Sequence, residues 1–301
     1  MPLSRRAFAA ALVACVAATP VRAQGTGPAV VLIDTAVLTS PLLDESSGIV
    51  ASRRRPGLYW THNDSGDGPT LYVTDSTGAG LGRVVVDGAQ NLDWEDLAIG
   101  PCTRSAGTCL YIGDVGDNNA SRRSVSIYVV PEPDPPADAR AAPTRVAVED
   151  TIILRYPDHP HDAEALAVIG GWLYLVTKDR AGPPLMFRSP ARVTGPRVLS
   201  LVGALPINTG ILRGRLVTGA ASSGDGRLLV LRTYVSLHLF LMNDGTPTPL
   251  TGRDGISIPV VETQGEGVCI DSRGLLVLIG ERGRLHHAII ARLRLTGVPA
   301  P

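Results

Sequence analysis

The sequence predicts an all-β protein, a single β-propeller of four-stranded blades. Helical periodicity is nearly absent, and short runs rich in leucine and β-branched residues alternate with turns at intervals of roughly 8–12 residues. A unit of four such runs recurs with a spacing of roughly 50 residues. The last unit lacks one run, which the other end of the chain supplies. A repeated four-stranded unit favours a propeller over a sandwich or a barrel.

Each unit begins with a small or acidic residue followed by apolar residues. A turn and a second run, which often starts Leu-Tyr, come next, and two more strands complete the unit. We count five units, and a sixth blade within residues 131–160 is the alternative. The first strands of the five units read SGIVAS (47–52), EDLAIG (95–100), EALAVI (164–169), TGAASS (218–223) and EGVCID (266–271).

The fifth unit ends with the chain after three strands. The segment AVVLIDTAV at residues 29–37 has the composition of the missing fourth strand. A strand borrowed from the far terminus closes the ring and removes an exposed sheet edge. The segment PEPDPPADARAAPTR at residues 131–145 is rich in Pro and Ala without periodicity. We interpret it as an extended surface loop.

Residues 1–23 have the features of a signal peptide, with Arg5 and Arg6 as the paired arginines of a twin-arginine signal. We expect cleavage after Ala23, which leaves residues 24–301 as one propeller domain, exported to the periplasm or the extracellular space. The apolar run is too short for a membrane anchor. Lipidation at Cys15, which ends the lipobox-like LVAC, is the alternative to soluble export.

The charge balance excludes some partners. Cleavage would take away three arginines and no acid, so the 28 basic and 28 acidic side chains become 25 and 28. This balance gives no reason to expect a nucleic acid or an acidic membrane as partner.

Two of the cysteines are spaced to form a disulfide. Cys102 and Cys109 bracket the polar segment TRSAGT, and in an oxidising compartment they should pair. The loop-entropy model gives so small a ring about 2.5 kcal/mol of stabilisation. Two free thiols are the alternative. Cys269 lies in the apolar run GVCI, so we expect a buried packing residue.

Acids at the start of three first strands are the main functional signal. First strands line the channel of a propeller. Aligning the units gives one equivalent residue per blade: Ser47, Glu95, Glu164, Thr218 and Glu266. Residues two positions earlier point the same way and form a layer nearer solvent: Glu45, Asp93, Asp162, Leu216 and Gln264. Buried carboxylates are costly unless paired, so we expect the channel to hold water, an ion or a ligand.

The ends of the second strands belong to the same mouth, because an antiparallel neighbour ends where the first strand begins. Lys178, one of these residues, is the only lysine in the chain. The segments GDVGDN (113–118) and NDSGD (63–67) lack the ligand spacing of an EF-hand and are interpreted as turns. The second-strand residues expected at the mouth are Asn63, Asp64, Asp114, Lys178, Asp179, Arg232 and Glu281.

A cluster of like charges needs a cation, protonation or basic partners. Hard oxygen ligands favour Ca²⁺ or Mg²⁺, and we take Glu95, Glu164 and Glu266 as the metal ligands. His159 and His161 lie just before Glu164, so Zn²⁺ or Mn²⁺ is a competing choice. A hydrated channel without a fixed ion and a network of ion pairs are the alternatives to a bound metal.

The strand pattern E-[DAG]-[LV]-[AC] at Glu95, Glu164 and Glu266 resembles exported bacterial propellers of the phytase-like esterase and gluconolactonase types. In the gluconolactonase type, axial carboxylates and amides hold a divalent ion that acts on a lactone or phosphoester. The resemblance spans residues 29–296 as architecture, and no complete set of catalytic residues matches. Only three Trp and three Phe are present, unlike propellers that stack sugars on aromatic rings.

Two functions follow from these observations. The first is an exported propeller whose acidic axial site binds a small ligand, with a divalent cation, or a partner protein. The second is a metal-dependent hydrolase of a small ester, lactone or phosphoester. In the hydrolase, the cation would polarise the substrate and activate a water. Asp114 or Asp162 would be the general base and Lys178 or Arg232 an anion clamp, while the ligand-binding residues would be Asn63, Asp64, Asp93, Gln264 and Glu281.

Overall fold

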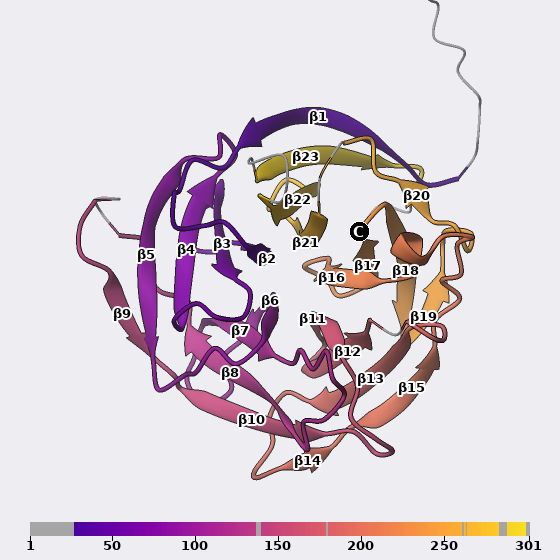
Figure 1. The fold of residues 1–301 in the computed structure, drawn as a ribbon, viewed down its shortest axis with the longest axis horizontal. Coiled ribbons are helices and arrows are strands. Elements are labelled where there is room, and N and C mark those ends of the chain that lie inside the picture. The colour runs from indigo at the N-terminus through magenta and orange to yellow at the C-terminus, as the bar shows by residue number, and fades with distance from the viewer. Residues whose placement is uncertain are drawn as a thin grey trace, which may run out of the picture.

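The computed structural model describes residues 27–136, 140–178, 180–260, 262, 264–282 and 288–298. They form five sheets around a central axis (Figure 1), so the predicted five-bladed propeller is confirmed. The predicted signal peptide, with Arg5, Arg6 and Cys15, lies outside the described residues, as does Asp179. The innermost strands of the five blades are β2 (Ser46–Ala51), β6 (Trp94–Pro101), β11 (Ala163–Ile169), β16 (Val217–Ser222) and β21 (Gln264–Ile270).

The second and third strands of each blade follow in chain order as antiparallel neighbours. The second strands are β3 (Leu58–Asn63), β7 (Thr108–Asp114), β12 (Trp172–Thr177), β17 (Leu228–Thr233) and β22 (Leu275–Glu281). The third strands are β4 (Thr70–Asp75), β8 (Val125–Pro131), β13 (Leu185–Pro190), β18 (Ser236–Asn243) and β23 (Ile289–Thr296).

The ring is closed by the N-terminal strand, as the sequence predicted. β1 (Ala29–Val37) lies along the outside of β23 (Figure 1) and pairs with it in antiparallel register from Ala29 opposite Thr296 to Val37 opposite Ile289. It is the fourth strand of the last blade. The fourth strands of the other blades are β5 (Gly80–Asp87), β10 (Asp150–Arg155), β15 (Ser200–Ala204) and β19 (Thr246–Pro249).

The alternative of a sixth blade is wrong for the described residues. β10 completes the second blade, and β9 (Thr144–Ala147) pairs in parallel with β5 on the outer edge of the first. The sequence predicted a loop over the whole Pro-rich segment 131–145. Its last two residues instead begin β9. Two more short strands lie outside the four-stranded pattern: β14 (Arg197–Val198) pairs in parallel with β10, and β20 (Ile256–Ser257) pairs with β18.

A β-bulge interrupts every innermost strand at the same place. In the second blade, for example, the pairing with the neighbouring strand shifts between Trp94 and Asp96. A bulge leaves a residue without a partner and bends the strand. The residues left over in the five blades are Ser47 with Gly48, Glu95, Glu164, Thr218 and Glu266. These are the residues that the sequence alignment made equivalent, so the bulge directs them out of the regular pleat.

Apolar side chains fill the space between each pair of neighbouring blades. Trp60 and Trp94 lie between the first and second blades, Phe187 between the second and third, and Phe240 between the third and fourth. Two further clusters join the last blade to the fourth and the first. None of the helical turns in the described ranges is long or apolar enough to cross a membrane.

The predicted disulfide is present. Cys102 and Cys109 are joined at an S–S distance of 2.10 Å in the connection between β6 and β7. This connection lies on the face of the propeller opposite the starts of the innermost strands. Cys269 is a buried free thiol in the cluster between the last blade and the first, in agreement with its predicted packing role.

Candidate functional site

The carboxylate of Asp96 closes the axial channel. Its Oδ2 accepts hydrogen bonds from the backbone N–H groups of Leu166 and Ala220, both at 2.9 Å, and its Oδ1 accepts one from Leu97 at 2.8 Å. These donors come from three different blades. Burial raises the pKa of Asp96 well above its usual value, and the three N–H donors oppose that change. The side chain therefore ties the innermost strands together on the axis.

Small residues make the space that Asp96 occupies. A Cβ atom added to Gly48 would lie 2.5 Å from the backbone nitrogen of Leu97. No role for Asp96 was predicted from the sequence, although it is the one large residue at its aligned position. The residues aligned with Asp96 in the other blades are Gly48, Ala165, Gly219 and Gly267.

Beyond Asp96 the channel contains a cavity of about 30 Å³ that is partly open to solvent. Residues of all five innermost strands line it, with Ile49, Leu97, Ala167 and Val268 among its walls. The other side of Asp96 is the side where the innermost strands begin.

Among the described residues, five carboxylates gather at that side in two groups, and we call these five the acidic mouth. Their ligand oxygens fall into two groups that share Glu95, and within each group the oxygens lie within 4.8 Å of one another. Glu95 and Glu164 are only 3% exposed, and the three aspartates are partly exposed. The structure thus places a buried layer beneath a layer nearer solvent. The two groups are Asp64, Asp93 and Glu95, and Glu95, Asp162 and Glu164.

The loop after β7 leaves room for two of these carboxylates at Gly116. A Cβ atom there would lie 2.5 Å from Oδ2 of Asp93 and would overlap Oε1 of Glu95. The segment GDVGDN, which contains Gly116, was interpreted as a turn. It is also the wall of the acidic mouth.

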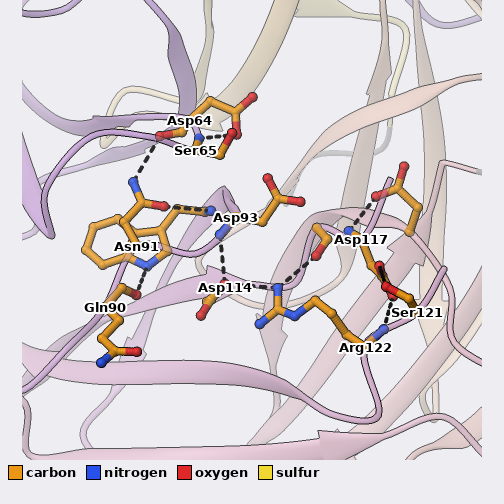
Figure 2. A network of polar contacts seen from close by, with 12 residues as sticks. Asp64, Ser65, Gln90, Asn91, Asp93, Asp114, Asp117, Ser121 and Arg122 are labelled. Atoms are coloured by element: carbon orange, nitrogen blue, oxygen red, sulfur yellow. Dashed lines mark hydrogen bonds and ion pairs between the residues drawn. The ribbon is translucent and has the colours of Figure 1, made fainter. Parts of the chain in front are cut away.

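Figure 2 shows how the same loop holds the aspartates. Asp114 accepts a hydrogen bond from the backbone of Asp93 at 3.0 Å and forms an ion pair with Arg122 at 3.0 Å, while the N–H of Asp117 donates to Asp162 at 2.9 Å. No hydrogen bond drawn there ends on the carboxylate of Asp93. Asp114 is buried and paired, so it supports the backbone of Asp93 and is not placed to be a general base.

A cationic and aromatic flank lies beside the acidic mouth. Lys178 forms an ion pair with Glu164, and its Nζ lies 5.2 Å from the ring centroid of Tyr234. The guanidinium carbon of Arg213 lies 4.7 Å from the same centroid. Cations over an aromatic face are attracted by its quadrupole. Tyr234 was not predicted from the sequence, because it directly follows β17 and belongs to no motif.

Glu266 lies near this flank but outside the two carboxylate groups. It is 3% exposed, and its Oε2 has no hydrogen-bond partner among the described residues. Gln264, from the layer nearer solvent, donates to Glu281 at 3.0 Å. Of the three glutamates expected to meet at one point, Glu95 and Glu164 therefore do so, and Glu266 lies outside their group.

Burial raises the pKa of several carboxyls in and beside the acidic mouth. The pKa values of Glu95 and Glu164 lie well above the usual range, because burial is reinforced by neighbouring carboxylates and only partly opposed by Lys178. Burial also raises the pKa of Glu266 to about 8 and that of Asp93 to about 6. The cluster would hold protons near neutral pH unless a cation joined it.

Arg232 does not reach the mouth, so its expected role as an anion clamp is wrong. The side chain is 0% exposed. It donates to the backbone oxygens of Gly267 at 2.7 Å and Ile279 at 2.9 Å and forms an ion pair with Glu262. These contacts bind the fourth blade to the last blade.

Two other expected residues are also engaged elsewhere. The amide of Asn63 donates to the backbone oxygen of Leu42 at 2.7 Å and to Asp67 at 2.9 Å, so it fixes the preceding loop. The ring of His161 contacts Asp158 at 3.1 Å. Neither carboxylate group of the mouth includes a histidine among the described residues, which removes the argument for Zn²⁺ or Mn²⁺ there.

No family model matches the sequence, and no curated protein matches it. Among solved structures, a luciferin-regenerating enzyme is 12% identical, with a TM-score of 0.45 over 91% of this chain and 82% of that one. A gluconolactonase from Xanthomonas campestris is 12% identical, with a TM-score of 0.43 over 83% and 72%. A protein of unknown function from Bacteroides thetaiotaomicron is 12% identical, with a TM-score of 0.43 over 89% and 76%. Likenesses this distant assign no activity to the chain.

Proposed function

We propose that the chain is an exported propeller whose acidic mouth binds a divalent cation, Ca²⁺ or Mg²⁺, together with a small ligand. The observation that carries this proposal is the pair of carboxylate groups sharing Glu95, with all oxygens of a group within 4.8 Å. Carboxylate oxygens are the ligands that these hard cations prefer. Beside these groups, Lys178 forms an ion pair with Glu164.

One local feature fits a cation. Gly116 leaves room for the carboxylates of Asp93 and Glu95 to approach the same position. Five carboxylates beside one ammonium group repel one another, and either protons or a cation relieves that repulsion. Asp64, Asp93 and Glu95 would hold the ion, with Asp162 and Glu164 on its other side.

Hydrolysis of a small ester, lactone or phosphoester is the second candidate, favoured by the flank of Lys178 and Tyr234. A bound cation would polarise the substrate and lower the pKa of a water. Lys178 would orient an anionic group of the substrate, because burial lowers its pKa but Glu164 and Glu266 raise it further and keep it charged. Asp162, half-buried at the rim, would accept a proton.

Calorimetric titration of the EDTA-stripped mature chain with Ca²⁺ and with Mg²⁺ tests the proposal. We expect one ion per chain and release of protons, because ligand carboxylates must be deprotonated. The loaded chain is then assayed with lactones, carboxylic esters and phosphomonoesters, with EDTA as control. Ion-dependent turnover supports the hydrolase, and ion binding without turnover supports a binding protein. A chain that binds neither ion contradicts the cation site.

A further inference from the structure

A second cavity lies between the fourth and last blades, on the face opposite the acidic mouth. Its volume is about 320 Å³, which is within the range of small-molecule sites. Most of its lining is apolar and only partly buried. We call it the leucine groove, after the apolar residues that form it: Leu228, Leu241, Leu250, Ile270, Leu275 and Leu295.

Three exposed arginines, Arg227, Arg273 and Arg294, also line the leucine groove. Arg273 pairs with the buried Asp271 at 3.3 Å, and Arg227 lies close enough to Asp225 to lower the pKa of that carboxyl, after the larger effect of hydrogen bonds. Arg294 has no carboxylate partner among the described residues. Among the charged side chains described there, three arginines and two aspartates leave one net positive charge beside the leucine groove.

We propose that the leucine groove binds a fatty carboxylate, a single alkyl chain with one negative charge. The carboxylate would pair with Arg294, whose planar fork suits that group. The alkyl chain would cover the leucine side chains, which otherwise lie at a water-accessible surface. This site is independent of the acidic mouth and goes beyond the cation-binding function.

The charge and shape exclude other small ligands. An alkylammonium would meet the unpaired arginine, and like charges repel. A dianionic phosphate would carry more charge than the net positive charge of the groove. A small polar anion would leave the apolar walls in water, so it would gain little from burial.

Calorimetric titration with dodecanoate below its micelle concentration tests the assignment. All titrations are done in EDTA, so that a carboxylate cannot bind through a metal ion. We expect one dodecanoate per chain, with dodecyltrimethylammonium and butanoate binding at least roughly tenfold more weakly, because they lack the negative head or the long chain.

Matched variants locate the binding. Arg294→Gln should weaken dodecanoate binding roughly tenfold. Arg197→Gln, which removes an exposed arginine outside the groove, and Glu95→Gln, in the acidic mouth, should leave it unchanged. Equal binding by Arg294→Gln and the unaltered chain overturns the proposal, as does equal binding of dodecyltrimethylammonium. A dimer in light scattering that excludes dodecanoate also overturns it, because a second copy would then occupy the groove.

Discussion

At the scale of single residues, Asp96 differs from its counterparts in the other blades because its carboxylate accepts hydrogen bonds from three backbone N–H groups. Its bonds to Leu166 and Ala220 cross the axis to two other blades. The sequence could show that Asp96 stands among small residues. It could not show the contacts, because the five innermost strands come together only in the closed ring.

Asp96→Ala should lower the free energy of unfolding by about 3 kcal/mol or more, because it leaves buried N–H groups without acceptors. Urea denaturation followed by circular dichroism measures the change. Asp44→Ala, at an exposed aspartate, is the control and should change stability by less than about 0.5 kcal/mol. Equal denaturation midpoints for Asp96→Ala and the unaltered chain would show that the axial bonds contribute nothing.

His238 should make the protein less stable in mild acid. Its side chain is 1% exposed, its Nε2 lies 3.0 Å from the hydroxyl of Ser236, and burial lowers its pKa to about 4. The unfolded chain, with a histidine pKa of about 6.5, therefore binds a proton between pH 6.5 and 4 that the folded chain does not. Stability present above pH 6.5 is lost as the pH falls through this window.

The expected loss from His238 is about 2 kcal/mol between pH 7 and pH 5. Urea denaturation at the two pH values measures it, and His238→Asn should reduce the loss by that amount. Burial also lowers the pKa of His62 to about 4. The His238→Asn variant should therefore still lose some stability between pH 7 and pH 5. An unchanged pH dependence in His238→Asn would mean that His238 is not buried in its neutral form.

At the scale of elements, local sequence patterns predicted the features that short stretches of the chain determine by themselves. The strand runs, the disulfide hairpin and the closing strand at residues 29–37 are of this kind. The bulges were not predicted, because a bulge is defined by the register of two strands. The parallel pairings of Thr144–Ala147 and Arg197–Val198 were missed for a similar reason: each joins a short segment to a strand of another unit.

Removal of residues 24–40 should destabilise the whole domain, because β1 covers the edge of β23 and Asp34 forms an ion pair with Arg292. We expect the melting temperature to fall by at least about 10 °C. A chain lacking only residues 24–27 is the control. Differential scanning calorimetry of both would refute the closing role if the longer deletion melted within about 2 °C of the control.

At the scale of the whole molecule, the propeller is a closed ring of five blades. Asp96 joins innermost strands across the axis, and the acidic mouth lies on the side where those strands begin. The carboxylates lie on the first three blades, and Tyr234 lies on the fourth, beside Lys178. The repeat and the strand pairing predicted the carboxylates of the acidic mouth, but they also placed Glu266 and Asp114 there, which lie outside both carboxylate groups. Neither could predict Tyr234, or the contacts that hold Arg232 between the fourth and last blades, because both depend on how adjacent blades meet.

The most direct test of the cation site compares Ca²⁺ binding by Glu95→Gln and Glu281→Gln. Glu95 belongs to both carboxylate groups, whereas Glu281 is a neighbouring carboxyl outside the acidic mouth, with its pKa raised by burial to about 7. Each variant removes one charge and keeps the side-chain shape, and near-ultraviolet circular dichroism checks the fold.

Titration calorimetry should give one Ca²⁺ per chain for the unaltered protein and for Glu281→Gln, with affinities within about threefold of each other. Affinity in Glu95→Gln should fall by roughly a hundredfold, because loss of a shared ligand costs at least as much as loss of a residue that supports one. Equal affinity in Glu95→Gln and the unaltered chain, or no saturable binding by the unaltered chain, would contradict the cation site.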